Sequence, residues 1–259
     1  MTSVERSELI SVIMPAHNSA RTLKSAAASV LIQTHESLEL LIVDDASIDN
    51  TPDICRELAA SDERVHVITN TCNIGALRSR LKAAKEAKAE WIAFLDSDDL
   101  WEPDKLTKQL AIREDTGCDL VYTGSAFMDE NGQPYEWIMH VPDSTEYNVL
   151  LKQNIISNSS VLVSKDAFIR YAPGDADNRD MHEDFACWLG MLKAGLTARG
   201  IDEPLITYRL SKGSQSGSKF KASSMNMNTY KYLGLGLFSR LYYQMCYSVN
   251  GIKKYRHFR

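Results

Sequence analysis

Short apolar runs alternate with amphipathic stretches along the first 115 residues. The apolar runs, which are typical of buried strands, are at 9–14, 38–43, 65–68 and 91–95. Between and after them, apolar residues recur at helical spacing, which predicts helices over about 19–33, 52–60, 76–87 and 103–114. This alternation with short connections predicts an α/β fold, in which a mainly parallel sheet carries helices on both faces. Pro15 is expected to end the first strand.

The second part of the chain is richer in strands. They are predicted, with a tight turn at Asn131 and Gly132, at 120–127, 135–139, 159–163, 197–201 and 205–209. One helix is predicted over 182–193. No linker separates this part from the first, so the two halves, 1–115 and 116–218, are expected to share one mixed sheet flanked by helices.

The C-terminal segment, 219–259, is expected to be a helical tail. A Ser/Gly-rich loop at 213–217 precedes it, and residues 230–249 are apolar and aromatic. Two glycines and Arg240 interrupt this stretch, so it falls short of a membrane-spanning helix. Four basic residues follow closely, which favours an amphipathic helix on a membrane surface over a helix packed on the body.

Charge is distributed unevenly along the 259 residues. The net charge is −5, yet no Asp or Glu follows Glu203 while ten Lys or Arg do, so residues 1–203 carry −15. This asymmetry predicts a tail that meets an anionic surface, and the acidic body favours a membrane over nucleic acid. Five cysteines without a CxxC pair indicate reduced thiols and a cytoplasmic setting. No signal-peptide pattern is expected at the N-terminus.

The fourth apolar run leads into three carboxylates within four residues, Asp96, Asp98 and Asp99. Carboxylates this close repel one another unless a cation or a proton lies between them. Such oxygen ligands suit Mg²⁺ or Mn²⁺, and a nucleoside diphosphate would supply the remaining ligands. The alternative interpretation is an acidic turn that caps the helix beginning near Pro103.

Polar residues follow the first two strands as well as the fourth. The three polar segments at predicted strand ends are 16–18, 44–45 and 96–99. The carboxyl ends of parallel strands meet at one edge of a sheet, where ligands bind. We therefore expect these segments to line a single cleft.

Three segments resemble, in order and spacing, the inverting family 2 glycosyltransferases of GT-A fold: 11–18, 42–51 and 94–99. Residues 73–75 and Arg80 match the family's spacing, Glu183 and Asp184 resemble its acidic pair, and 208–216 resemble its closing loop. The aromatic tail is similar to that of bacterial members that build teichuronic acid, capsule or O-antigen chains. The resemblance implies a GT-A-type α/β fold with a Rossmann-like mixed sheet and a helical C-terminal tail.

The resemblance implies that the first half binds a nucleotide-sugar and the second half binds the acceptor. Asp45 is implied to accept from the uracil edge, His17 to stack near the base, and Arg80 to meet the base or the diphosphate. Asp98 is implied to hold Mn²⁺ or Mg²⁺, with Asp96 at the metal or the ribose, so that the ion neutralises the departing diphosphate. The implied donor site comprises Pro15, Ala16, His17, Asn18, Asp45, Asn73, Arg80, Asp96, Ser97 and Arg209.

Asp184 is implied to be the general base. An acceptor hydroxyl is a poor nucleophile at neutral pH, so a positioned carboxylate must take its proton as it attacks the anomeric carbon. In-line attack opposite the leaving diphosphate then inverts the anomeric centre. Glu183 is implied to position Asp184 at the acceptor site, or else faces solvent. Trp188, one helical turn further on, either floors the acceptor-sugar site or packs in the core.

Two positions depart from the family pattern. The family's Ala-Arg-Asn triplet reads Ser79, Arg80 and Leu81 here, which keeps the arginine and loses the asparagine. The closing loop lacks the His that often follows its arginine and ligates the metal. Lys212 lies in that stretch instead, either to pair with the diphosphate or as a solvated charge.

The predicted function is transfer of a sugar from a nucleotide-sugar, a UDP-sugar by resemblance, to a saccharide or lipid-linked saccharide. The expected setting is surface polysaccharide synthesis on the cytoplasmic face of a bacterial membrane. A nucleotidyltransferase would carry a Gly-rich basic loop after its first strand, which residues 15–18 are not. A glycoside hydrolase also uses paired carboxylates but needs no nucleotide. The non-enzymatic alternative is a nucleotide- or saccharide-binding protein of the same fold without turnover.

Overall fold

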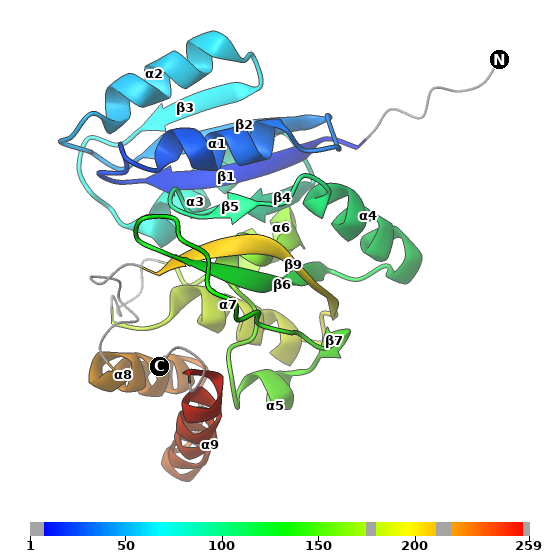
Figure 1. Ribbon diagram of the computed structural model, residues 1–259. Coiled ribbons are helices and arrows are strands. Elements are labelled where there is room, and N and C mark those ends of the chain that lie inside the picture. The colour runs from blue at the N-terminus through cyan, green and yellow to red at the C-terminus, as the bar shows by residue number, and fades with distance from the viewer. Residues whose placement is uncertain (1–7, 175–179, 211–218, 256–259) are drawn as a thin grey trace.

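The computed structural model describes residues 8–174, 180–210 and 219–255, in which helices cover both faces of one sheet (Figure 1). Within these ranges the sheet has nine strands in the order β3-β2-β1-β4-β8-β6-β9-β5, with β7 paired to β9. The strands are β1 (Ile10–Ala16), β2 (Leu38–Asp44), β3 (Val65–Thr69), β4 (Trp91–Phe94), β5 (Leu100–Trp101), β6 (Leu120–Asp129), β7 (Ser144–Thr145), β8 (Leu162–Ser164) and β9 (Ala198–Leu210). The helices are α1 (Leu23–Leu31), α2 (Thr51–Ser61), α3 (Ala76–Glu86), α4 (Lys105–Thr116), α5 (Tyr147–Leu150), the 3₁₀ turn η1 (Asn158–Ser160), α6 (Lys165–Tyr171), α7 (Glu183–Lys193), α8 (Lys219–Tyr232) and α9 (Leu237–Tyr255).

The first half forms the parallel part of the sheet, as predicted. β1 lies between β2 and β4 and runs parallel to both, and β3 extends the sheet beyond β2. Every residue of β1 and β2 is buried, which explains the unbroken apolar runs. β1 continues through Pro15 to Ala16, so the predicted stop at Pro15 is wrong. β4 ends at Phe94, opposite Ile13, so no strand on that flank needs the missing N–H of Pro15.

Side chains that alternate along β1 contribute to two cores, one on each face of the sheet. On one face α1, α2 and α4 pack against Val12 and Met14, and on the other α3, α6 and α7 pack around Ile13. The ring of Phe94 on β4 lies 4.7 Å from that of Phe168 on α6. This packing holds the helices of the second half against the strand that precedes the acidic turn.

The second half joins the same sheet but differs from the prediction in several places. β8 begins only at Leu162, because the start of the predicted strand at 159–163 forms η1, and α5 and α6 were not predicted. β9 is one strand instead of two and runs parallel to β6, with register shifts on both sides of Gly124. A Cβ atom on Gly124 would lie 2.9 Å from the carbonyl oxygen of Glu203, so this close approach requires glycine. The predicted strand at 135–139 is absent, because this segment meets β6 only through isolated bridges and Pro134 has no N–H to extend the pairing.

The C-terminal segment forms two helices rather than one. Gly234, at φ +80°, adopts the left-handed conformation that glycine favours and separates α8 from α9. α8 packs on the body, where Tyr230 is fully buried and its hydroxyl donates to the Leu151 carbonyl at 2.8 Å. One side of α9 also meets the body, where the Tyr243 hydroxyl donates to Asn148 Oδ1 at 3.3 Å.

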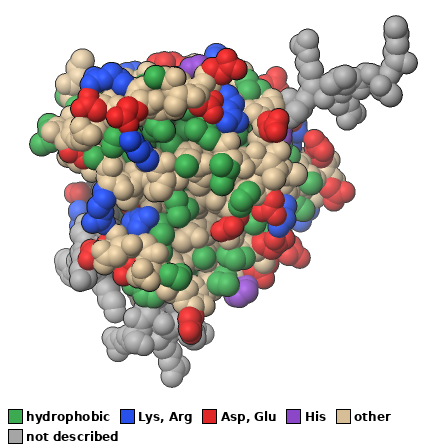
Figure 2. All heavy atoms as spheres, turned by 45° about the horizontal axis from the view of Figure 1, so that its top comes forward, with side chains coloured by type: hydrophobic (Ala, Val, Ile, Leu, Met, Phe, Trp, Pro, Cys, Tyr) green, Lys and Arg blue, Asp and Glu red, His purple; other side chains and the backbone are tan. Residues whose placement is uncertain are grey.

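Several surface features bear on the predicted partners. Within the described part of the chain, none of the helices has the length and apolarity to span a membrane. All five cysteines are free. Figure 2 shows acidic and basic side chains interspersed over the face that it presents. The predicted loop at 213–217 and Lys212 lie outside the described residues.

Candidate active site

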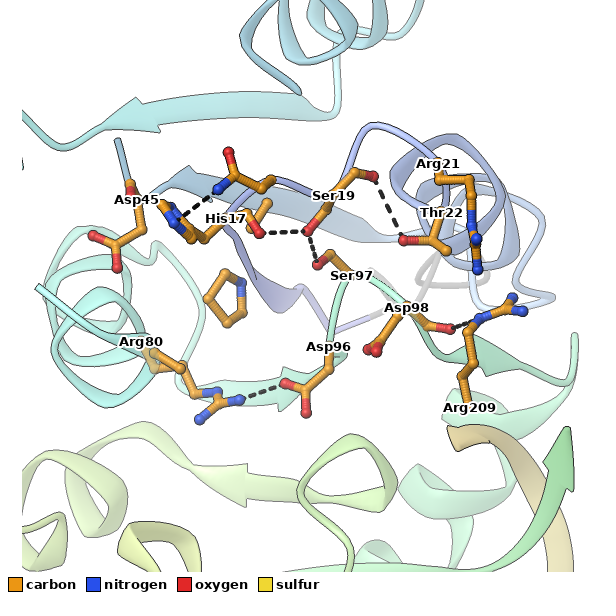
Figure 3. Close-up of a pocket in the computed structure, with 14 residues that line it drawn as sticks. His17, Ser19, Arg21, Thr22, Asp45, Arg80, Asp96, Ser97, Asp98 and Arg209 are labelled. Atoms are coloured by element: carbon orange, nitrogen blue, oxygen red, sulfur yellow. Dashed lines mark hydrogen bonds and ion pairs between the residues drawn. The ribbon is translucent and has the colours of Figure 1, made fainter. Parts of the chain in front are cut away.

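The carboxyl ends of β1, β2 and β4 meet at one edge of the sheet, which confirms the predicted convergence of the three polar segments. A cavity of about 490 Å³ opens there (Figure 3). Its lining comprises Pro15, Ala16, His17, Asn18, Ser19, Arg21, Thr22, Asp45, Ala76, Arg80, Asp96, Ser97, Asp98 and Arg209. Nine of the ten predicted donor-site residues are in this set, and Asn73 is not.

Asp99 anchors the acidic turn and is 1% exposed. Its Oδ2 accepts from the Ser159 hydroxyl at 2.6 Å, and its Oδ1 accepts from the backbone N–H of Arg209 at 2.9 Å. The N–H of Asp96 donates to the same Ser159 hydroxyl at 3.1 Å. Burial raises the pKa of Asp99 well above its usual range, and the charges of Asp96 and Asp98 raise it further. Asp99 therefore ties the turn to η1 and β9 and does not reach the cavity.

Asp96 and Asp98 face the cavity. Asp96 forms an ion pair with Arg80 of α3. Burial raises the pKa of Asp98 to about 6, the charge of Asp96 adds to this, and Arg209 opposes it. A negative charge at Asp98 is therefore unfavourable in the folded protein, and a cation beside it would reverse that preference.

Both carboxylate oxygens of Asp45 accept hydrogen bonds. Oδ1 accepts from Asn70 Nδ2 and from the Ile74 N–H, each at 2.9 Å, and Oδ2 accepts from the Gly75 N–H at 2.8 Å. Burial alone would raise the pKa of Asp45, but these hydrogen bonds outweigh it and hold the pKa below its usual range. The side chain of Asn73 is exposed, and it is Asn70, which the sequence analysis missed, that contacts Asp45. Asn70 directly follows β3, so the strand-end criterion would have found it.

The loop after β1 is shaped by His17 and Asn18. His17 Nδ1–H donates to the Asp45 carbonyl at 2.8 Å, and Nε2 accepts from Asn18 Nδ2 at 3.0 Å. Asn18, at φ +52°, adopts the left-handed conformation that asparagine tolerates. Its Oδ1 accepts from the Ile48 N–H at 2.9 Å, which ties this loop to the loop after β2.

Ser97 and Arg209 connect the acidic turn to its surroundings. The Ser97 and Ser19 hydroxyls lie 2.7 Å apart, and Arg209 Nε donates to the Asp98 carbonyl at 2.9 Å. Arg21 lines the same end of the cavity and was missed by the sequence analysis. An arginine in a polar loop carries no pattern of its own, so no local signal selects it.

Glu183 and Asp184 begin α7 and are both half-buried. Burial raises the pKa of Glu183, Arg80 opposes this, and Asp184 adds to it. Burial also raises the pKa of Tyr208, and the carboxylates of the acidic turn and of Asp184 raise it further. Asp184 does not line the cavity itself, yet its charge acts on Tyr208, as do the charges of the acidic turn. Its role as the base stays a prediction.

Residues 11–173 match the family model described as Glycosyl transferase family 2. The chain belongs to glycosyl transferase family 2. Its relatives include TuaG of Bacillus subtilis (strain 168), a glycosyltransferase named for teichuronic acid biosynthesis, at 36% identity over 95% of this chain and 97% of that protein. WfaP of Escherichia coli, named as a UDP-Glc:α-D-GlcNAc-diphosphoundecaprenol β-1,3-glucosyltransferase, is 32% identical over 96% of each chain. The resemblance found in the sequence is therefore confirmed.

Solved structures share the fold of this family 2 glycosyltransferase. Staphylococcus aureus TarS 1–349 in complex with UDP-GlcNAc superposes with a TM-score of 0.67 at 18% identity, covering 86% of this chain and 65% of that one. The mannosyltransferase PcManGT from Pyrobaculum calidifontis, in complex with GDP-Man and Mn²⁺, gives 0.65 at 18% identity, covering 88% and 64%. The chain thus spans less than two thirds of either structure. The likeness confirms the predicted GT-A-type fold.

Trp188 of this family 2 chain lies in the core, which corrects its predicted place at the acceptor site. The side chain is fully buried, and its ring lies 6.3 Å from that of Phe94 and 6.5 Å from that of Phe168. One turn beyond Asp184, α7 is already covered by the sheet and α6, so an apolar ring is favoured there. The alternative interpretation, core packing, is confirmed.

Two carboxylates of the family 2 site are available to a divalent cation. The described residues include no group of three His, Cys, Asp or Glu side chains that would hold a metal by themselves. Asp98, with Asp96 nearby, offers two carboxylates at the cavity. Mg²⁺ and similar hard ions bind through one or two carboxylates when substrate phosphates complete the shell. The residues therefore fit an ion that is bound together with a nucleoside diphosphate.

Proposed function

We propose that this chain is an inverting glycosyltransferase that moves a sugar from a UDP-sugar to a saccharide or lipid-linked saccharide, in the synthesis of a bacterial surface polysaccharide. The observation that carries the proposal is the cavity at which three strand ends bring Asp45, Asp96 and Asp98 together, while Asp184 and the acidic turn both act electrostatically on Tyr208. Residues 1–115 bind mainly the donor and 116–218 the acceptor. The name of WfaP, which specifies a UDP-Glc donor and a diphosphoundecaprenol-linked acceptor, supports these substrate classes.

The donor binds with its base at Asp45 and its diphosphate at Asp98. Asp45 Oδ2 accepts one hydrogen bond from the described residues and keeps a lone pair for a pyrimidine N–H. The exposed His17 ring donates to the backbone carbonyl of Asp45 and stacks on the base. Asp96, fixed by Arg80, meets the ribose between the two ends. Figure 3 shows Asp45 and His17 at one side of the cavity, with Asp98 and Arg209 at the other.

Asp184 acts as the general base. It takes the proton of the acceptor hydroxyl as the oxygen attacks the anomeric carbon, while the bond from that carbon to the diphosphate oxygen breaks on the opposite side. An α-linked donor then gives a β-linked product, which agrees with the β-1,3 linkage in the name of WfaP. When bound, a Mn²⁺ or Mg²⁺ ion held by Asp98, with Asp96 beside it, would supply Lewis-acid neutralisation of the leaving diphosphate.

A donor panel tests this function. UDP-, GDP- and dTDP-sugars are incubated with the full chain, Mn²⁺ and a lipid-linked GlcNAc acceptor, and nucleotide release and the product are measured. We expect acceptor-dependent release of UDP from one UDP-sugar and a product with the inverted anomeric configuration. UDP binding without release from any donor would contradict catalysis and leave a nucleotide-binding protein.

We also propose that α9 lies on an anionic membrane surface. Its outward row of apolar side chains recurs at helical spacing and is at least half exposed: Phe238, Leu241, Tyr242, Met245 and Val249. Tyr243 and Tyr247 on the other side pack against the body. An apolar row in a segment with ten basic and no acidic residues beyond Glu203 suits lipids of negative charge. The enzyme then works at the inner face of the cytoplasmic membrane, where it meets a lipid-linked acceptor.

Vesicle sedimentation tests this placement. We expect the full chain to bind phosphatidylglycerol vesicles, and the triple variant F238A/L241A/M245A to bind about 100-fold more weakly, because each truncated side chain loses about 1 kcal/mol of burial. Ile32→Ala, which shortens a side chain 62% exposed at the end of α1, is the matched control and should bind as wild type. Unchanged binding by the triple variant would contradict the placement.

A further inference from the structure

Two arginines bring positive charge to one side of the cavity. Arg21 lies in the segment between β1 and α1, and Arg209 lies next to the end of β9. Both line the cavity near Asp98, on the side away from Asp45 (Figure 3). Arg209 belongs to the predicted donor site, whereas Arg21 has no role so far.

The two guanidinium groups converge on one loop of backbone. Arg21 Nη2 donates to the carbonyl of Glu130. Arg209 Nη1 approaches the same carbonyl at 3.5 Å and that of Asp129 at 3.4 Å, while its Nε donates to the Asp98 carbonyl at 2.9 Å. Two groups of like charge are thus gathered around one carbonyl oxygen, directly beside the acidic turn.

Other basic side chains in this part of the molecule are paired with carboxylates. Arg80 is paired with Asp96, and Lys24 on α1 is paired with Glu57. Across the described ranges, Arg21 and Arg209 make hydrogen bonds to backbone carbonyls and no salt bridge to a carboxylate. Like charges so placed repel one another, so the arrangement favours an anion between them. Arg21 uses one of its five N–H donors, which leaves others for that anion.

We propose that Arg21 and Arg209 form a clamp for the β-phosphate of the donor's diphosphate, an inference that rests on the proposed function and adds Arg21 to the donor site. A guanidinium fork matches two phosphate oxygens, so it both orients the group and neutralises its charge. With the base at Asp45, the diphosphate extends to the side of the cavity where both arginines lie. The bond from Arg209 Nε to the Asp98 carbonyl keeps the clamp at a fixed place relative to the Asp98 carboxylate.

The clamp makes the affinity for UDP less dependent on the divalent cation. Charge on the departing nucleoside diphosphate is shared between the arginines and the ion at Asp98. Part of the affinity for UDP therefore persists in a chelator, and that part depends on Arg21. Arg21 adds nothing to the affinity for uridine or UMP, because both lack the β-phosphate.

Calorimetric titration of the full chain with UDP, UMP and uridine, each in EDTA and in Mn²⁺, tests the clamp. We expect Arg21→Ala to bind UDP about tenfold more weakly in both buffers, as for the loss of one charge-assisted hydrogen bond. UMP and uridine should bind within about twofold of wild type. Arg21→Lys should recover part of the UDP affinity, because it restores the charge without the fork. The control is Lys24→Ala, since Lys24 is a basic residue in the first turn of α1 and lies outside the cavity lining; it should bind all three ligands as wild type.

The outcomes separate the clamp from the function on which it rests. Wild-type affinity of Arg21→Ala for UDP would overturn the clamp, and so would an equal loss for UDP and uridine. A wild-type chain that binds none of UDP, UMP and uridine in either buffer would overturn the proposed function itself. UDP binding by wild type that Arg21→Ala selectively weakens supports both.

Discussion

Asp184→Asn is expected to lower the rate of sugar transfer by about 10²- to 10⁴-fold and to leave UDP affinity within about twofold of wild type. A carboxamide has the shape of the carboxylate but cannot take a proton from the acceptor hydroxyl. Its oxygen can still accept from the Phe185 N–H, which donates to Asp184 Oδ1 at 2.7 Å, so the start of α7 should be preserved. The effect falls on catalysis alone because Asp184 lies outside the residues that line the donor cavity.

The measurement is acceptor-dependent UDP release at saturating donor, together with UDP affinity by calorimetry. Asp166→Asn is the matched control, since Asp166 is also an acidic residue in the first turn of a helix, is exposed, and lies outside the cavity lining. It should transfer sugar as wild type. Transfer by Asp184→Asn within tenfold of the control would exclude Asp184 as the base and direct attention to Glu183.

Asp98→Asn is expected to have two opposite effects. Transfer should fall by about 10²- to 10³-fold, because a neutral amide neither attracts the divalent ion nor compensates its charge. The ligand-free protein should become more stable at neutral pH. Burial is the main reason that the pKa of Asp98 rises to about 6, so its ionised form is unfavourable in the folded state.

Protonation of Asp98 stabilises the folded protein at low pH. The folded carboxyl of Asp98 holds its proton more tightly than the unfolded one, whose pKa is 3.8, so the stability that protonation provides is present below pH 4 and is lost as the pH rises through about 6. The shift corresponds to up to about 3 kcal/mol, and partial exposure reduces this to about 1–2 kcal/mol. Asn does not titrate, so Asp98→Asn removes this loss.

Thermal unfolding in EDTA at pH 4 and at pH 7.5, repeated at pH 7.5 with UDP and Mn²⁺, measures both effects. The variant should melt above wild type at pH 7.5, and the gap should shrink at pH 4. Added UDP and Mn²⁺ should stabilise wild type more than the variant, since a ligand raises stability only as far as it binds the folded state. A variant that melts below wild type at pH 7.5 in EDTA would contradict the unfavourable charge at Asp98.

The sequence was most informative where the local pattern and the fold agree. The four apolar runs became β1 to β4: β1 and β2 are buried throughout, β4 is buried from its second residue, and only β3, at the edge of the sheet, is mostly half-buried. Parallel strands then brought the polar ends of β1, β2 and β4 to one edge. The helical tail was predicted as well, but the boundary between α8 and α9 depended on the left-handed conformation of Gly234.

The sequence was least informative where residues far apart along the chain determine a side chain's surroundings. Three nearly adjacent carboxylates look alike in the sequence, yet Asp96 pairs with Arg80, Asp99 is buried against Ser159, and Asp98 faces the cavity. Trp188 was equally ambiguous, because its spacing from Asp184 suits either an acceptor site or a core.

The sequence by itself determined the family, the parallel half of the sheet and the edge at which the chemistry lies, because apolar runs and strand-end polar residues are local patterns. Only the tertiary structure decided the separate surroundings of the three carboxylates, the core position of Trp188 and the meeting of Arg21 with Arg209. Each of these depends on segments that lie far apart along the chain, such as Arg21 and Glu130, and no local pattern records which distant segments will pack together.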